Sequence, residues 1–167
     1  MSPVRTILHP TDLSENSEYA FRLACSLARD YGARLIVAHV VEPPIYVSYG
    51  ELEKILQHPL GYTLELEAKL AKHRALDPKI PMEHHLLEGN AVDEILNLAE
   101  ETQSDLIVMA THGRKGLSRL LMGSVAEKIV RKAPCPVLTV KIPAPNRVTS
   151  SESTSTAGEK TLSSGPT

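Results

Sequence analysis

Short apolar runs alternate along this chain with longer stretches that carry apolar residues at a helical period. These runs predict strands at Val4–His9, Leu35–Val41, 82–89, 104–111 and Val137–Lys141. The second and fourth runs are almost continuously apolar, which is typical of parallel strands covered on both faces. Parallel neighbours need crossover connections, and these are right-handed. The alternation therefore predicts a parallel sheet with helices on both faces.

The stretches between the strands predict amphipathic helices. In 13–31, Tyr or Leu recurs at every fourth position from 19 to 31 beside a row of alanines, and Gly32 ends the helix. The helix expected over 62–76 buries the face that holds Leu64, together with three alanines. Asn90 is expected to cap a helix that continues to about residue 103.

Composition limits the classes of protein and of partner. A formal net charge of −2 and an isoelectric point of about 6.4 argue against nucleic-acid and acidic-membrane partners. No apolar run is long enough for a membrane span or a signal peptide. Cys25 and Cys135 lie among apolar neighbours, so buried free thiols and a cytoplasmic location are expected. We predict one domain over 1–142 and a disordered Ser/Thr-rich tail over 143–167.

The segment ATHGRKGLSRLLMGS, which begins at Ala110, resembles a phosphate-binding loop without matching either of the two common glycine patterns. Gly113 lets the backbone approach a ligand closely, and Arg114 adds positive charge. Gly123 and Ser124 stand at the start of the last predicted helix, where backbone N–H groups and the helix dipole favour an anion. Ser124, with Glu three residues later, has the spacing of a capping box. This segment is therefore predicted to clamp an anion.

Ligands of open parallel sheets bind beyond the carboxyl ends of the strands, where the winding direction reverses. The motif HPTD follows the first strand and the glycine loop follows the fourth, so a split site is expected between them. Asp12 can contact a ligand there or simply cap the turn. His39 is interpreted as a hydrogen-bonded core residue. His84 and His85 are adjacent on a strand, so they point to opposite faces and cannot share a metal ion.

From about Val4 to Ile142 the chain resembles the universal stress protein family. The resemblance rests on the pattern G-x2-G-x9-G-[S/T], the flanking strand, the following helix, the opening PTD and the terminal run PCPVLTV. It implies a Rossmann-like fold of the adenine-nucleotide alpha-hydrolase type, with strand order 3-2-1-4-5. It also implies a cytoplasmic stress-response regulator that forms homodimers through the last strand, Val137–Lys141.

For the branch that keeps the glycine signature, the resemblance implies an adenine nucleotide, ATP, as the ligand, with or without a magnesium or manganese ion. Carried over by position, the adenosine lies against the first turn and the end of the second strand. The ribose and α-phosphate pass the end of the fourth strand, and the outer phosphates meet the amides of the last helix. The residues assigned in that order are Pro10, Thr11, Asp12 and Val40; Met109, Ala110, His112 and Gly113; and Gly123, Ser124 and Val125. No catalytic or metal-ligating side chain is predicted, and at most slow ATP hydrolysis is expected.

One position departs from the family pattern, because Ala110 stands where the signature has its first glycine. If that residue requires a positive φ, alanine costs roughly 1 kcal/mol relative to glycine; otherwise only a methyl group is added near the sugar. The family also contains a branch without the glycine signature, which forms dimers and does not bind ATP. A third hypothesis is an ATP-using enzyme of a related fold, but HPTDLSEN is not the SGGxDS-like loop of the ATP pyrophosphatases.

Overall fold

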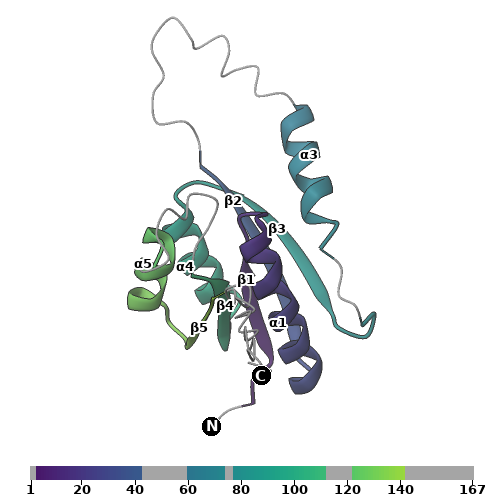
Figure 1. The fold of residues 1–167 in the computed structure, drawn as a ribbon, viewed down its shortest axis with the longest axis vertical. Helices are drawn as coiled ribbons and strands as arrows, with labels where there is room; N and C mark the ends of the chain where they lie inside the picture. Colours follow the sequence, from purple (N-terminus) through teal and green to yellow (C-terminus); the bar gives the residue numbers. More distant parts are fainter. Residues whose placement is uncertain (1–2, 43–59, 74–76, 112–121, 142–167) are drawn as a thin grey trace, which may run out of the picture.

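A computed structural model describes residues 3–42, 60–73, 77–111 and 122–141, without the side chains of 60–63. Its centre is a five-stranded sheet with the order β3-β2-β1-β4-β5, in which all neighbouring strands are parallel (Figure 1). The predicted fold class and strand order are thus confirmed. The strands are β1 (Thr6–Pro10), β2 (Arg34–Val41), β3 (Met82–Glu88), β4 (Leu106–Ala110) and β5 (Val137–Val140).

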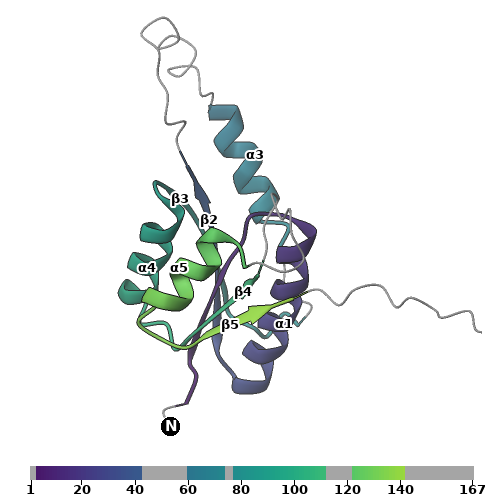
Figure 2. The same ribbon diagram turned by 60° about the vertical axis from the view of Figure 1, so that its left-hand side comes forward.

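Helices cover both faces of the sheet, as Figures 1 and 2 show. One apolar cluster joins α1 and α3 to the face that holds Ile7, Val37 and Val108. A second cluster joins α4 and α5 to the opposite face, which holds Leu8 and Ile107. The three layers follow from the period of two along each strand, which sends successive side chains to opposite faces. The described helices are α1 (Glu15–Tyr31), α3 (Leu60–Leu70), α4 (Ala91–Glu101) and α5 (Ser124–Lys132).

Helix α1 lies against the sheet through small residues. Its alanine row is buried, whereas Tyr19 and Tyr31 of the neighbouring row are exposed, so only part of the predicted apolar face is inside. The Ser14 hydroxyl accepts a hydrogen bond from the Ser17 N–H at the start of the helix. Gly32 ends it in the left-handed conformation, at φ 65°. Alanines lack bulk, so the helix backbone can approach the strands closely.

Helix α3 differs from its prediction in both length and face. It ends at Leu70 instead of about residue 76, and it buries Leu66 and Leu70, while Leu64 is 60% exposed. Two leucines four positions apart bury more apolar area than the alternative row of one leucine and several alanines. The row with two leucines therefore faces the core. The last residues of the predicted helix, 74–76, lie outside the described part of the chain.

Two further expectations concern the whole chain. Among the described residues, no helix has the length and apolar character needed to cross a bilayer. The predicted tail, 143–167, lies outside the described residues.

Candidate functional site

The two central strands separate at their carboxyl ends. The pairing of β1 with β4 consists of Ile7 with Leu106 and Leu8 with Ile107. Beyond Leu8, β1 stays paired with β2 as far as Pro10 and Ala38, and β4 stays paired with β5 as far as Ala110. The point where the winding reverses is therefore also where these strands part, and this is the expected ligand position in an open parallel sheet.

We call the place where β1 and β4 separate the split. The turn from β1 into α1 lies on one side of it and forms its first wall. The Thr11 N–H donates to the Ala38 carbonyl at 2.8 Å. The Thr11 hydroxyl faces inward, where its oxygen accepts hydrogen bonds from the Leu13 N–H at 3.0 Å and the Ser17 hydroxyl at 2.9 Å. Thr11 is buried, so this predicted site residue connects the turn to β2 and to α1.

Asp12 has the capping role that the sequence left open. Its Oδ1 accepts from the Ser14 N–H at 3.1 Å and from the Ser14 hydroxyl at 2.6 Å. Leu13, between them, has a φ of 62°, a left-handed conformation that few non-glycine residues adopt. The half-buried carboxylate of Asp12 thus stabilises a tight turn at the edge where the ligand is expected.

The end of β4 forms the other wall. Met109 is buried, and Ala110 is half-buried as the last residue of the strand. Positive φ values occur at only two described non-glycine residues, Leu13 and Gln103, so Ala110 has ordinary extended geometry. Alanine is therefore accommodated at the signature's first glycine position without backbone strain, and the departure from the family pattern amounts to one methyl group.

Helix α5 begins beside this wall. The Gly123 N–H donates to the Thr111 carbonyl at 2.8 Å, and the Thr111 N–H donates to the Val140 carbonyl at 2.9 Å. These two hydrogen bonds connect the start of the helix to the ends of β4 and β5. The helix start is consequently placed at the same edge of the sheet as the β1–α1 turn.

The predicted capping box at Ser124 is wrong. Gly123 is the N-cap, with φ −62° and ψ 148°, because its carbonyl accepts the first helical hydrogen bond, from the Glu127 N–H at 2.9 Å. Ser124 is then the first helical residue, and no side chain among the described residues caps α5, whereas Ser14 caps α1 and Asn90 caps α4. The N–H groups of the first turn have no acceptor within the helix, so the start of α5 can receive an anion.

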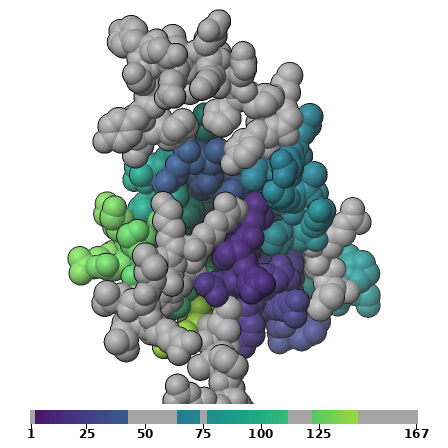
Figure 3. All heavy atoms as spheres, turned by 45° about the horizontal axis from the view of Figure 1, so that its top comes forward, coloured from purple at the N-terminus to yellow at the C-terminus, as the bar shows by residue number. Residues whose placement is uncertain are grey.

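The remaining predicted site residues lie at the same edge or outside the description. Pro10 is buried at the end of β1, and Val40 is half-buried near the end of β2. In Figure 3 the purple segment with the β1–α1 turn lies between green α5 and teal α3. The sheet brings together Pro10, Thr11, Asp12, Val40, Met109, Ala110, Gly123, Ser124 and Val125, whereas His112, Gly113 and Arg114 lie outside the described residues.

Two buried histidines form hydrogen bonds to the backbone on either side of the split. The Nδ1 of His39 lies 2.7 Å from the Thr11 carbonyl, and the Nδ1 of His9 lies 2.8 Å from the Val108 carbonyl. The interpretation of His39 as a hydrogen-bonded core residue is confirmed. Burial lowers the pKa of His9 from 6.5 to about 4, against the opposing effect of the Val108 carbonyl. The sequence indicated no role for His9, although this residue opens the motif HPTD, because the partner of its ring lies on another strand.

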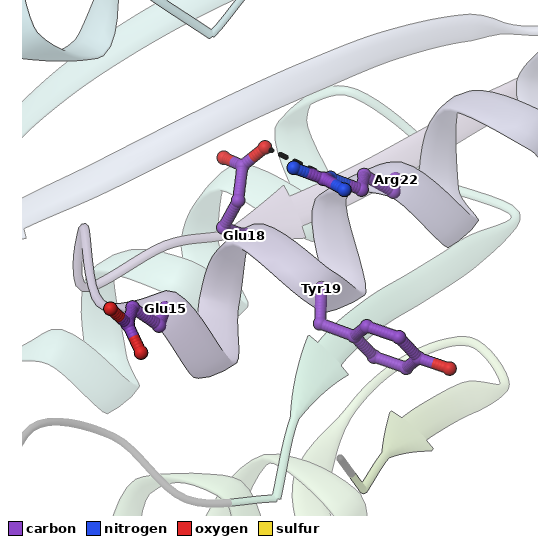
Figure 4. Close-up of a pocket in the computed structure, with 4 residues that line it drawn as sticks. All are labelled: Glu15, Glu18, Tyr19 and Arg22. Atoms are coloured by element: carbon purple, nitrogen blue, oxygen red, sulfur yellow. Dashed lines mark hydrogen bonds and ion pairs between the residues drawn. The ribbon is translucent and has the colours of Figure 1, made fainter. Parts of the chain in front are cut away.

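A hollow of about 260 Å³ lies elsewhere, on the outer side of α1 (Figure 4). Its lining comes from one helix and consists of Glu15, Glu18, Tyr19 and Arg22, with Glu18 and Arg22 paired at 3.4 Å. Its two carboxylates would repel an anionic ligand. The carboxyl edge of the sheet, which draws on three strands and a helix start, is the stronger candidate site.

The fold and this edge define a Rossmann-like α/β domain with the start of a helix at its switch point. Residues 3–141 match the model of the universal stress protein family, and the chain belongs to that family. Universal stress protein MJ0531 of Methanocaldococcus jannaschii is 36% identical over 145 residues, which cover 83% of each chain.

Solved structures agree with this assignment. The structure of MJ0577, another universal stress protein of Methanocaldococcus jannaschii, has a TM-score of 0.72 and 28% identity, covering 86% of this chain and all of its own. A universal stress protein in complex with cAMP has a TM-score of 0.57 and 26% identity, covering 84% of this chain and 98% of its own.

Proposed function

We propose that this universal stress protein is a stress-response regulator that binds ATP between the β1–α1 turn and the start of α5. The observation that carries the proposal is the first turn of α5, which no described side chain caps and which the Gly123–Thr111 hydrogen bond holds at the switch point of the sheet. A family member that was solved with cAMP supports an adenine nucleotide as the ligand class.

The two walls have different parts in this proposal. The adenosine lies against Pro10, Asp12 and the backbone of Thr11, with Val40 presenting its backbone to the adenine. The ribose and α-phosphate pass Met109 and Ala110, and the outer phosphates accept hydrogen bonds from the first-turn amides of α5. The assigned residues outside the description, His112, Gly113 and Arg114, belong to the phosphate half by their place in the sequence.

We expect binding rather than rapid turnover. The carboxylate of Asp12 already holds Ser14 in the turn, and the His9 ring donates to a strand carbonyl, so both act structurally. Among the described residues, no three His, Cys, Asp or Glu side chains are grouped so that they could hold a metal ion. A magnesium or manganese ion would therefore enter with the phosphates, whose oxygens are its preferred ligands.

A valine at the helix start tests the proposal. Gly123→Val places a branched side chain among the first-turn amides and supplies a poor N-cap, so the Kd for MgATP is expected to rise about tenfold or more. Isothermal titration calorimetry measures it. The matched control is Met122→Val, which puts the same side chain one position earlier at an exposed residue and should leave the Kd within about twofold.

Equal MgATP affinity for wild type and Gly123→Val would contradict the site. Absence of binding by the wild type would favour the second candidate function, a family dimer that acts only through protein contacts.

We also propose a homodimer joined through β5, whose far side carries no described strand. Leu138 of β5 is 37% exposed, and an apolar edge strand is a template for pairing with another chain.

Leu138→Lys should shift the protein from dimer to monomer at micromolar concentration, because the interface would then bury an unpaired charge. Sedimentation velocity decides this, with Val130→Lys on α5 as a control of similar exposure. Sedimentation of the wild type as a monomer would contradict the proposed homodimer.

The remaining proposals concern location and boundaries. Cys25 and Cys135 are both free; burial and the nearby Glu18 raise the pKa of Cys25 to about 11, and burial raises the pKa of the half-buried Cys135. Unpaired, poorly reactive thiols are typical of a reducing compartment, which supports a cytoplasmic location. We assign the family domain to 1–142 and a tail to 143–167.

A further inference from the structure

Two histidines on neighbouring strands donate hydrogen bonds to the two walls of the split. His9 of β1 reaches the Val108 carbonyl of β4, and His39 of β2 reaches the carbonyl of Thr11 in the β1–α1 turn. A carbonyl oxygen can only accept, so Nδ1 carries the proton in both rings. Both side chains point to the face of the sheet that α1 covers, because His9 and His39 have the same parity as Ile7 and Val37.

His9 acts where the backbone pairing stops. The ladder between β1 and β4 ends at Leu8 and Ile107, and the His9 ring ties β1 to β4 one residue further on, at Val108. Its ring also packs against Phe21 of α1, with 5.7 Å between the ring centres. The ring thereby fixes how far apart the two strands stand immediately below the split.

His39 acts on the turn itself. The Thr11 N–H donates to the Ala38 carbonyl, and the Thr11 carbonyl accepts from His39. Both backbone groups of Thr11 are therefore hydrogen-bonded to β2. Two residues later the chain adopts the left-handed conformation at Leu13, which persists only where its surroundings impose it. Loss of the His39 hydrogen bond would release one of the restraints that impose this turn.

We propose that His39 and His9 are positioning residues of the nucleotide site. His39 holds the β1–α1 turn where the adenosine half is formed, and His9 sets the spacing between β1 and β4. This inference rests on the proposed function, but it assigns roles to two side chains that do not touch the ligand. Both act through backbone carbonyls, and neither takes part in chemistry.

The experiment exploits the position of the donor within the side chain. The amide nitrogen of asparagine lies close to the position of Nδ1, whereas that of glutamine lies near Nε2. His39→Asn should retain the hydrogen bond and keep the Kd for MgATP within about threefold of wild type. His39→Gln and His39→Leu should both raise that Kd about tenfold, with His39→Leu guarding against a result specific to the glutamine variant.

Two further readouts separate positioning from a general loss of stability. Leu66→Ala creates a cavity under α3 and serves as a destabilised control that should leave the Kd unchanged. Amide hydrogen exchange of Leu13 and Ser14 in the nucleotide-free protein should accelerate about tenfold in His39→Gln and His39→Leu, and remain slow in His39→Asn.

The outcomes distinguish this inference from the proposed function. If wild type binds MgATP and His39→Gln binds it equally well, the positioning role is wrong and the function stands. If wild type binds no nucleotide, the function is wrong, and unchanged exchange at Leu13 in His39→Gln would overturn the positioning role as well. Nitrogen-15 spectra that show the Nε2–H tautomer at His9 or His39 would overturn it independently of any ligand.

Discussion

Acidification from pH 7 to pH 4 is expected to lower the free energy of unfolding by about 3 kcal/mol through His9 alone. The pKa of this histidine is about 4 in the folded chain, against 6.5 as the ordinary value. Between these values the unfolded chain binds a proton that the folded chain does not bind. The stabilisation is therefore complete above pH 6.5 and is lost as the pH falls toward 4.

Urea denaturation at half-unit steps between pH 7.5 and pH 4 measures this dependence. His9→Gln should start from a lower stability but lose most of the slope within this window. His85→Gln, which replaces a half-buried histidine on the edge strand β3, is the matched control and should retain the wild-type slope. A slope that is the same in wild type and His9→Gln would show that His9 does not titrate in this way.

Truncation of Ile129 should have a comparable effect by a different route. Helix α5 has only two buried residues in its described length, Ala126 and Ile129, and Ile129 is fully buried against the face of the sheet that holds Leu8. Ile129→Ala removes most of this apolar contact, and a cost of about 3 kcal/mol in the free energy of unfolding is expected. Chemical denaturation measures the loss.

The neighbouring Val130 supplies the control. It is 46% exposed on the same helix, so Val130→Ala should change the free energy of unfolding by about 0.5 kcal/mol or less. Because α5 carries the first-turn amides, Ile129→Ala should also weaken MgATP binding, whereas Val130→Ala should not. Equal losses of stability in the two variants would contradict the packing of α5 described above.

The strands could be predicted because parallel strands buried on both faces appear in the sequence as nearly continuous apolar runs. Leu35–Val41 can hardly be placed anywhere except inside a sheet, and the family signature then determines the order. The helical rows were harder to assign. In α3, period alone cannot choose between the row with Leu64 and the row with Leu66, and only contact with the rest of the molecule decides.

The edge of the sheet at which the candidate site is expected could be predicted from the sequence, but the local contacts at that edge could not. Glycine and serine at 123 and 124 both favour an N-cap, and the hydrogen bond from Gly123 to Thr111 decides between them. That contact joins residues on either side of the segment 112–122, so no local pattern reveals it. The conformation of Ala110 and the contacts of His9 likewise depend on neighbours from other strands.

The Gly123–Thr111 hydrogen bond also has a meaning for how such a protein can change over evolution. It joins the backbones of the two residues that flank the segment 112–122, so this contact does not use the side chains of that segment. The entropic cost of joining two ends of a chain grows slowly, by about 0.6 kcal/mol for each doubling of the length between them. Replacing this segment with the corresponding segment of a relative, even one of different length, is therefore expected to leave the sheet and α5 in place.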